Sequence, residues 1–318
     1  MSRRFLEHHQ IWIYVACVLL GLGLGRTTPP LFETLAAVTW PVLGLLLYVT
    51  FTQVPLVQVP HAFQDRQFMG AVLIGNFLII PLVVGFLLNF LPAEQPALRL
   101  GVLLVLLVPC TDWYITFTHL CGGDTRRAIA VTPVNLFMQL GLMPFYLWIF
   151  MGNAFWELWS AEQITLVIVS LILLPLGAAW ITERWAERFQ KGASFINHLS
   201  GFQVPLLGAV IFLIAASQAE TAFQALPVLP HVLGIFIAFL FVAAGIGTAL
   251  ARSMQLSSGS ARALIFSLGT RNSFVVLPLA LALDSPWETA TVVIVFQSLV
   301  ELFGMVAYLW IVPRYLAR

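Results

Sequence analysis

The chain has 318 residues, of which 60% are hydrophobic and only 9% are charged, and its mean hydropathy is +0.95. Soluble globular domains carry roughly 25% charged residues, so this composition predicts a polytopic membrane protein and excludes a soluble domain. The 15 Lys and Arg residues against 14 Asp and Glu residues are too few and too balanced to form a basic face for nucleic acid.

Apolar runs long enough to cross a bilayer as helices, about 20 residues each, occur ten times along the chain. They lie near residues 11–25, 35–51, 68–91, 98–120, 128–150, 164–181, 202–217, 232–250, 261–283 and 290–312. The first run follows two arginines but is not followed by a cleavage signal, so we interpret it as a retained helix. The expected fold class is an all-α integral membrane protein with ten transmembrane helices.

Basic residues indicate the orientation of these crossings. Placing both ends of the chain in the cytoplasm puts twelve of the 15 Lys and Arg residues on that side, and they are Arg3, Arg4, Arg66, Arg126, Arg127, Arg184, Arg188, Lys191, Arg252, Arg262, Arg314 and Arg318. Arg26 and Arg99 fall outside, and Arg271 lies within the membrane. Since Lys and Arg concentrate in cytoplasmic loops, the asymmetry supports ten crossings with cytoplasmic termini, in the inner (plasma) membrane.

Ten crossings divide into two halves of five, about residues 1–152 and 153–318, within a single transporter domain that spans residues 1–318. Because each half has an odd number of crossings, a duplicated unit must lie inverted in the membrane. The fourth and ninth runs then correspond, and polar residues interrupt both of them, at 108–112 and 267–273. Paired interruptions of this kind are the best sequence indication of a transporter's site near the middle of the membrane.

The fourth run is broken at Pro109, which removes a backbone donor, and Cys110, Thr111 and Asp112 then offer a thiol, a hydroxyl and a carboxylate. A proline kink with a polar patch between helices is the alternative interpretation. Asp112 favours a binding site, because a carboxylate at mid-membrane depth costs about 2.5 to 3.5 kcal/mol on insertion scales.

The ninth run carries Arg271, Asn272 and Ser273 at nearly the place that Asp112 holds in the fourth. We therefore expect Asp112 and Arg271 to face each other and pair, which offsets the cost of inserting both charges. The pair is either a fixed ion pair or a functional one. In the functional version Asp112 accepts a proton or cation while Arg271 moves between Asp112 and the substrate.

Two further runs contain intramembrane polar residues. Thr132, Asn135 and Gln139 in the fifth run share one helical face, which either lines a cavity or forms hydrogen bonds with a neighbouring helix. Glu301 in the tenth run, four residues after Gln297, is either a proton carrier or a carboxyl held by a neighbouring donor.

Nothing in the sequence indicates an enzyme or a cofactor. A phosphate-binding Gly-Lys loop, a metalloprotease His-Glu pair and a Gly-x-Ser-x-Gly nucleophile motif are all missing from the sequence. The three cysteines lie in or at the ends of apolar runs, which does not indicate disulfides. The partners expected are the lipid bilayer and a small inorganic or organic solute, with H⁺ or Na⁺ as the coupling ion.

Four short blocks resemble the arsenical-resistance arsenite permeases, within the bile acid:sodium symporter superfamily. They are 107–111 (LVPCT) with 118–120 (THL), 134–136 (VNL) with Pro144, 271–274 (RNSF), and 299–301 (LVE). The resemblance implies a ten-helix inverted-repeat carrier in which the fourth and ninth helices cross in a core domain. It also implies that Cys110 is needed for the efflux of trivalent arsenic and antimony in exchange for protons. A thiol suits such a soft metalloid, although a buried cysteine is more often only a small apolar residue.

The chain departs from that family in two ways. Val275 stands where the family has a glutamate, and the family lacks the charged pair Asp112 and Arg271. Asp112 or Glu301 would then have to supply the missing carboxylate. The function expected is arsenite or antimonite efflux by proton antiport through alternating access. The first alternative is a sodium- or proton-coupled symporter of a small organic anion bound by Arg271, and the second is a non-transporting membrane sensor.

Overall fold

The computed structural model describes residues 3–28, 32–55, 65–152, 161–283 and 286–316. Within these ranges the chain forms helices and no strand, which confirms the all-α prediction. The helices up to residue 151 are α1 (Arg3–Thr27), α2 (Phe32–Phe51), α4 (Arg66–Ile74), η3 (Gly75–Ile79), α5 (Ile80–Leu87), η4 (Leu88–Phe90), α6 (Pro96–Leu106), α7 (Trp113–Leu120) and α8 (Thr125–Met151). The later ones are α10 (Ala161–Val167), η5 (Ile168–Leu173), α11 (Leu174–Arg188), α12 (Gln190–Ser200), α13 (Gln203–Ser217), α14 (Ala219–Ala225), α15 (Leu229–Ser253), α16 (Ser258–Gly269), α17 (Ser273–Leu281), α18 (Thr289–Ile311) and η6 (Val312–Leu316).

Seven of the described helices are long and apolar enough to cross a membrane, and α12 with α13, bent by 41°, form an eighth candidate. Large apolar side chains such as Trp12, Leu82 and Phe241 point outward from them, as lipid-facing residues do. The fourth and ninth apolar runs are each divided into two short helices, so neither is counted among the eight. Ten crossings in two inverted repeats therefore remain a prediction, and the repeat boundary at 152/153 adjoins residues 153–160, outside the described part.

Prolines distort two of the long helices locally. The π-helical segments η3 and η5 directly precede α5 and α11. These two helices carry Pro81 and Pro175 in their first turn. A proline has no N–H to donate and clashes with the carbonyl one turn earlier, so the helix widens there. Asn76 lies in the first of these segments and is fully buried.

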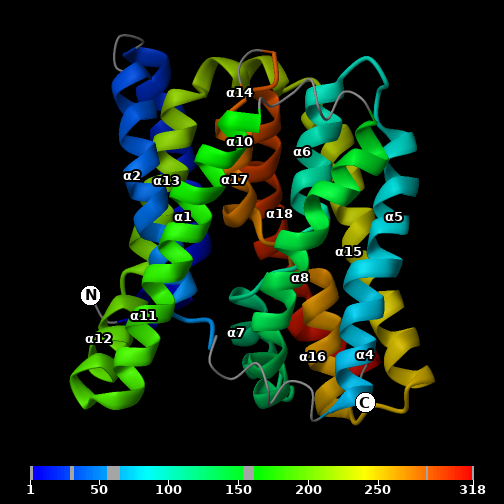
Figure 1. Ribbon diagram of the computed structural model, residues 1–318. Coiled ribbons are helices and arrows are strands. Elements are labelled where there is room, and N and C mark those ends of the chain that lie inside the picture. The colour runs from blue at the N-terminus through cyan, green and yellow to red at the C-terminus, as the bar shows by residue number, and fades with distance from the viewer. Residues whose placement is uncertain (1–2, 29–31, 56–64, 153–160, 284–285, 317–318) are drawn as a thin grey trace.

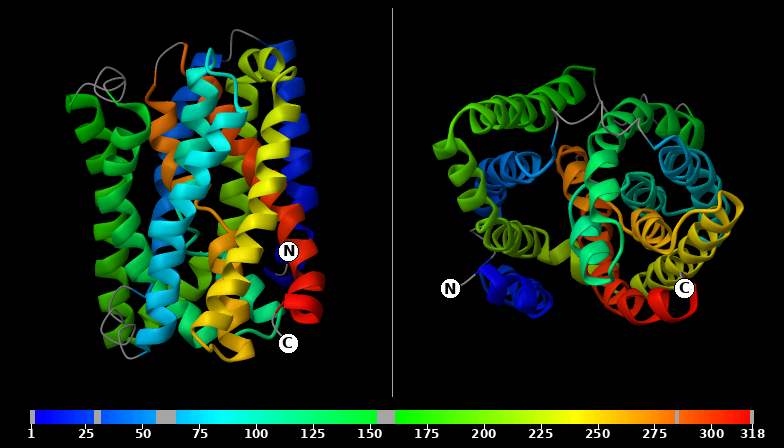
Figure 2. Two further views of the ribbon diagram at one scale, coloured as in Figure 1. Left: turned by 90° about the vertical axis from the view of Figure 1, so that its right-hand side faces the viewer. Right: turned by 90° about the horizontal axis from the view of Figure 1, so that it is seen from below.

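The helices form two groups that stand side by side (Figure 1). In one group α13 packs against α1 and α2, and α2 packs against α11. In the other, α15 packs against α16 and α18, and α6 packs against α18 (Figure 2). The approach of α1 to α13 depends on small residues, because a Cβ at Gly21 would lie 2.6 Å from the carbonyl oxygen of Phe212.

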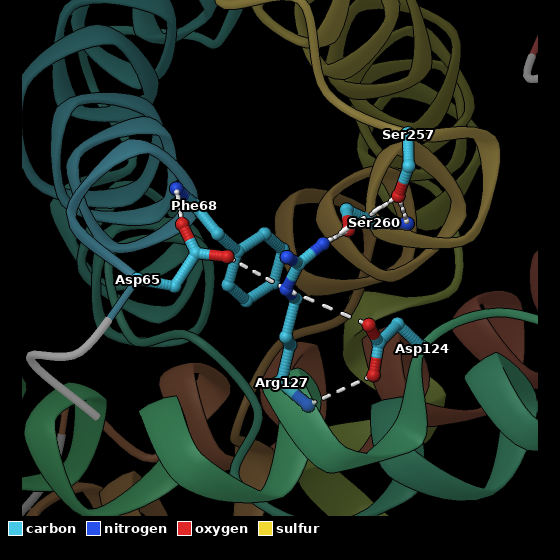
Figure 3. Close-up of polar contacts among 6 residues, drawn as sticks. All are labelled: Asp65, Phe68, Asp124, Arg127, Ser257 and Ser260. Atoms are coloured by element: carbon cyan, nitrogen blue, oxygen red, sulfur yellow. Dashed lines mark hydrogen bonds and ion pairs between the residues drawn. The ribbon is translucent and has the colours of Figure 1, made fainter. Parts of the chain in front are cut away.

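One arginine joins three helix starts in the second group (Figure 3). The Nε of Arg127 lies 2.7 Å from a carboxylate oxygen of Asp65 and 3.5 Å from one of Asp124, and its Nη1 donates to the hydroxyl of Ser260. Asp65, Asp124 and Ser257 each accept a hydrogen bond from the first turn of α4, α8 and α16. Arg127 therefore connects the N-caps of three helices at one end of the molecule.

Replacing Arg127 with alanine is expected to lower the melting temperature of the purified protein. The loss should correspond to about 1 kcal/mol, because the ion pairs are partly exposed and two carboxylates are left without their cation. High salt should shrink the difference, since it screens these charges. Arg126→Ala is the matched control, because Arg126 is exposed. Equal melting temperatures for wild type and R127A would show that the arginine does not stabilise this end.

Candidate functional site

The two interruptions lie against each other. The backbone N–H of Cys110 donates to the carbonyl oxygen of Thr270 over 3.2 Å, and that of Asn272 donates to the carbonyl oxygen of Val108 over 2.8 Å. These bonds form a short antiparallel bridge between Pro109 and Arg271. Backbone that leaves a helix inside a membrane must find partners in the protein, and here each interruption supplies them to the other.

Asn272 connects the two interruptions through its side chain as well. Its Nδ2 donates to the hydroxyl of Thr111 over 3.1 Å, while its Oδ1 accepts from the backbone N–H of Val275 over 3.4 Å. The second bond makes Asn272 the N-cap of α17. Residue 275 is a valine buried in the core, so its backbone rather than its side chain takes part in the site.

Arg271 is buried at the crossing, and its guanidinium is bound by oxygens from three elements. Nη1 donates to the carbonyl of Leu106 (3.2 Å), and Nη2 donates to the side-chain oxygen of Asn76 (2.8 Å) and to the carbonyls of Ser267 (3.2 Å) and Leu268 (2.7 Å). The guanidinium carbon also lies 5.3 Å from the ring centre of Phe239. All four oxygen partners are uncharged.

The predicted pair of Asp112 with Arg271 is wrong, because neither a hydrogen bond nor an ion pair joins the two side chains in the structure. Each charge lies at the end of a half-helix that suits it. Asp112 is the N-cap residue of α7, where the helix dipole is positive, and Arg271 reaches the C-terminal carbonyls of α6 and α16, where it is negative. The carboxylate of Asp112 accepts a hydrogen bond from the Gln203 amide instead.

Glu301 approaches the crossing from α18. Its Oε2 accepts the backbone N–H of Arg271 over 2.8 Å and the side-chain amide of Gln297 over 2.7 Å, and Gln297 in turn accepts from the hydroxyl of Ser273. Glu301 is 1% exposed, and among the described residues its Oε1 has no hydrogen-bond partner. A carboxyl with one fixed and one unoccupied oxygen can take up a proton or hold a ligand on the second.

The predicted polar face of α8 is buried. The hydroxyl of Thr132 lies 2.7 Å from that of Tyr114, which satisfies both groups. All four side-chain polar atoms of Asn135 and Gln139, in contrast, lack a hydrogen-bond partner in the part of the chain described. Leaving a buried polar group unpaired costs about 1 to 3 kcal/mol, so these amides are candidates for contact with a polar solute, an ion or water.

A cavity of about 590 Å³ lies between the two helix groups. Its walls include Tyr14 of α1, Gln203 of α13 and Asp112 with Trp113 at the start of α7. The Sγ of Cys110 lies directly behind this wall, since it accepts the backbone N–H of Asp112 at 3.5 Å. Cys110 is 5% exposed and does not line the cavity itself, whereas Asp112 and Trp113 do.

The structure thus brings together most of the residues that the sequence singled out. Six of them meet where the interruptions cross, namely Cys110, Thr111, Arg271, Asn272, Ser273 and Glu301. Asp112 faces the cavity, and Thr132 and Asn135 lie on α8. The described residues contain no group of three or more His, Cys, Asp or Glu that could hold a metal ion.

Sequence reasoning did not identify Asn76 and Gln203, the partners of Arg271 and Asp112. Asn76 is a lone amide in the apolar run 68–91, and a polar residue in such a run is itself a signal. Gln203 lies at the start of the seventh run, where it is indistinguishable from a loop residue. Only the fold, which brings the start of α13 to the start of α7, reveals its role.

The chain matches the sequence profile of the Sodium Bile acid symporter family over residues 40–225. It is 25% identical over 301 residues to the "Arsenical-resistance protein Acr3" of Corynebacterium glutamicum, covering 84% of this chain and 81% of that one. The Acr3 protein of Alkaliphilus metalliredigens is 23% identical over 66% of this chain and 64% of its own length. The "Uncharacterized sodium-dependent transporter YocS" of Bacillus subtilis is 26% identical over 87% of this chain and 82% of its own.

Proposed function

Because the chain belongs to the Sodium Bile acid symporter family, a family of membrane transporters and not of enzymes, we propose that it is a secondary transporter that exports arsenite or antimonite in exchange for protons. The match over more than half of the chain agrees with the resemblance seen in its motifs. The relatives named for arsenical resistance support the choice of solute. The side chains at the crossing of the two interruptions support the same choice of solute.

The observation that carries the proposal is that the guanidinium of Arg271 is already hydrogen-bonded to protein oxygens. Among the described residues Arg271 is the cation at the crossing, and uncharged oxygens already hold its guanidinium. The remaining groups there are a thiol, hydroxyls, amides and the carboxyl of Glu301. This set suits a neutral, polyhydroxylated solute with a soft centre, and arsenous acid is neutral at pH 7. It suits an organic anion poorly, because both terminal nitrogens of Arg271 already donate to protein oxygens and, among the described residues, only its buried Nε has no partner. The carboxyl of Glu301 at the same crossing would also repel an anion.

The cavity is the proposed route to the site. It is lined by Gln10 and Tyr14 of α1, by Gln53 and Pro55 just after α2, and by the last turns of α18. With cytoplasmic termini, as the distribution of basic residues predicts, this is the state from which an exporter takes up its solute. Alternating access then requires the group of α1, α2 and α13 to move relative to the group that holds the interrupted helices.

The alternative is a symporter of a small organic anion, and the specific observation in its favour is the likeness to a protein named a sodium-dependent transporter. In that case the anion would bind in the cavity, away from Arg271. The side chains of Gln10, Gln53 and Gln203, which line the cavity, would be its hydrogen-bond donors. The two functions differ in both solute and coupling ion, so one experiment can separate them.

The test is transport by the purified protein in proteoliposomes. With an acidic lumen and no sodium gradient, we expect the vesicles to accumulate radioactive arsenite, and a protonophore should abolish the accumulation. Protein-free liposomes are the control. If arsenite is not accumulated but an inward sodium gradient drives uptake of the bile acid taurocholate, the export proposal is wrong and the symporter alternative is correct.

A further inference from the structure

The surroundings of the Arg271 guanidinium have the composition of a cation-binding site. Its four oxygen ligands, at 2.7 to 3.2 Å, are three backbone carbonyls and one side-chain amide oxygen. The carbonyls of Leu106, Ser267 and Leu268 belong to the last turns of α6 and α16. Such carbonyls have no partner within their own helix and lie at the negative end of its dipole.

Two interrupted helices that end at one point therefore create a place for positive charge. In transporters with broken helices, carbonyls of this kind coordinate a sodium ion or bind a proton. Asn76 completes the oxygen set from the π-helical segment η3, and the buried ring of Phe239 covers one side of the guanidinium. An aromatic face attracts a cation and offers nothing to an anion.

We propose that the Arg271 guanidinium is a covalently attached cation that fills a cation-binding site at the ends of α6 and α16, so that the chain binds no sodium ion there. A second hydrogen bond fixes the orientation of the Asn76 amide, because its Nδ2 donates to the hydroxyl of Ser267 over 3.1 Å. Its oxygen therefore faces the guanidinium. The site is thus preorganised for a cation. The existence of this cation site does not depend on the transport function proposed above. Only its consequence for ion coupling rests on that function.

If this is correct, removing the side chain leaves an oxygen-lined site that a free cation can enter. We expect purified Arg271→Ala to melt several degrees below wild type in detergent. Guanidinium, and more weakly Na⁺, should raise its melting temperature, because a ligand that binds only the folded state stabilises it. The same salts should leave wild type unchanged or slightly destabilised.

Two controls make the comparison specific. Arg127→Ala removes a partly exposed arginine whose partners are carboxylates at the helix starts, so guanidinium should not rescue it. Tetramethylammonium carries the same charge, but its methyl groups prevent the close approach of oxygens that both Na⁺ and guanidinium allow, so it should not rescue Arg271→Ala. An equal response of Arg271→Ala and wild type to both guanidinium and Na⁺ would overturn the proposal.

A second measurement covers the case in which Arg271→Ala cannot be purified. Wild-type protein should show no saturable binding of radioactive sodium, and Arg271→Lys, which keeps a cation, should fold and behave in the same way. Saturable sodium binding by wild type that Asn76→Ala abolishes would overturn the proposal, because the ion would then occupy the oxygen set at the ends of α6 and α16. Neither measurement uses arsenite, so a failure here is distinguishable from a failure of the transport proposal.

Discussion

Replacing Cys110 with serine is expected to abolish arsenite export while leaving the fold intact. Serine is nearly isosteric and can still accept the backbone N–H of Asp112 that now lies 3.5 Å from the sulfur. What it lacks is the soft ligand that a trivalent metalloid prefers. We expect at least about a tenfold loss of the initial rate, since a lost coordinate bond exceeds the roughly 1.4 kcal/mol that a factor of ten represents.

The measurement is acid-driven accumulation of radioactive arsenite in proteoliposomes at matched protein content. The chain supplies its own controls, because Cys17 lies on α1 and Cys121 follows α7 at its C-cap, both away from the crossing. Cys17→Ser and Cys121→Ser should transport like wild type. Unimpaired transport by Cys110→Ser would show that the thiol is only a small buried residue.

Replacing Glu301 with glutamine is expected to separate arsenite movement from proton movement. The amide oxygen can still accept the N–H groups of Arg271 and Gln297, so the local structure should persist. The amide group replaces Oε1, the oxygen without a partner in the described structure, and it cannot release a proton. Acid-driven accumulation should therefore fall to the level of empty liposomes, while exchange of internal for external arsenite continues.

Glu288→Gln is the matched control, because Glu288 is the N-cap residue of α18, away from the crossing, and accepts a hydrogen bond from Thr221. This variant should accumulate arsenite like wild type. If Glu301→Gln also accumulates arsenite normally, the proton is carried elsewhere. If it loses both accumulation and exchange and melts at a lower temperature, Glu301 has a structural role.

The proposed cation site agrees with a role for Glu301 in coupling. A guanidinium cannot be released, so a site filled by Arg271 cannot alternate between occupied and empty during a transport cycle. The exchangeable charge must then be supplied by another group. Glu301 accepts the backbone N–H of Arg271, and its second oxygen has no partner among the described residues, so it is well placed to supply this charge.

The sequence by itself determined the membrane class, the two interruptions and most residues that meet there. Helix breaks and charges are so costly in a bilayer that Pro109, Asp112 and Arg271 could be singled out without any structure. The order of the apolar runs also indicated that the fourth and ninth correspond. The structure confirms that these two interruptions lie together, through bonds such as that from Asn272 to Val108.

Only the tertiary structure decided which partner each charge takes. From the sequence, Asp112 and Arg271 were each other's best partners because they are opposite charges at matching positions. In the fold, the uncapped ends of half-helices carry partial charges that can bind an ionised side chain in place of an opposite charge. The direction of each half-helix determines whether its positive or its negative end lies beside that side chain. Arg271 therefore binds carbonyls and Asn76, from a helix 195 residues away in sequence, and Asp112 faces the cavity.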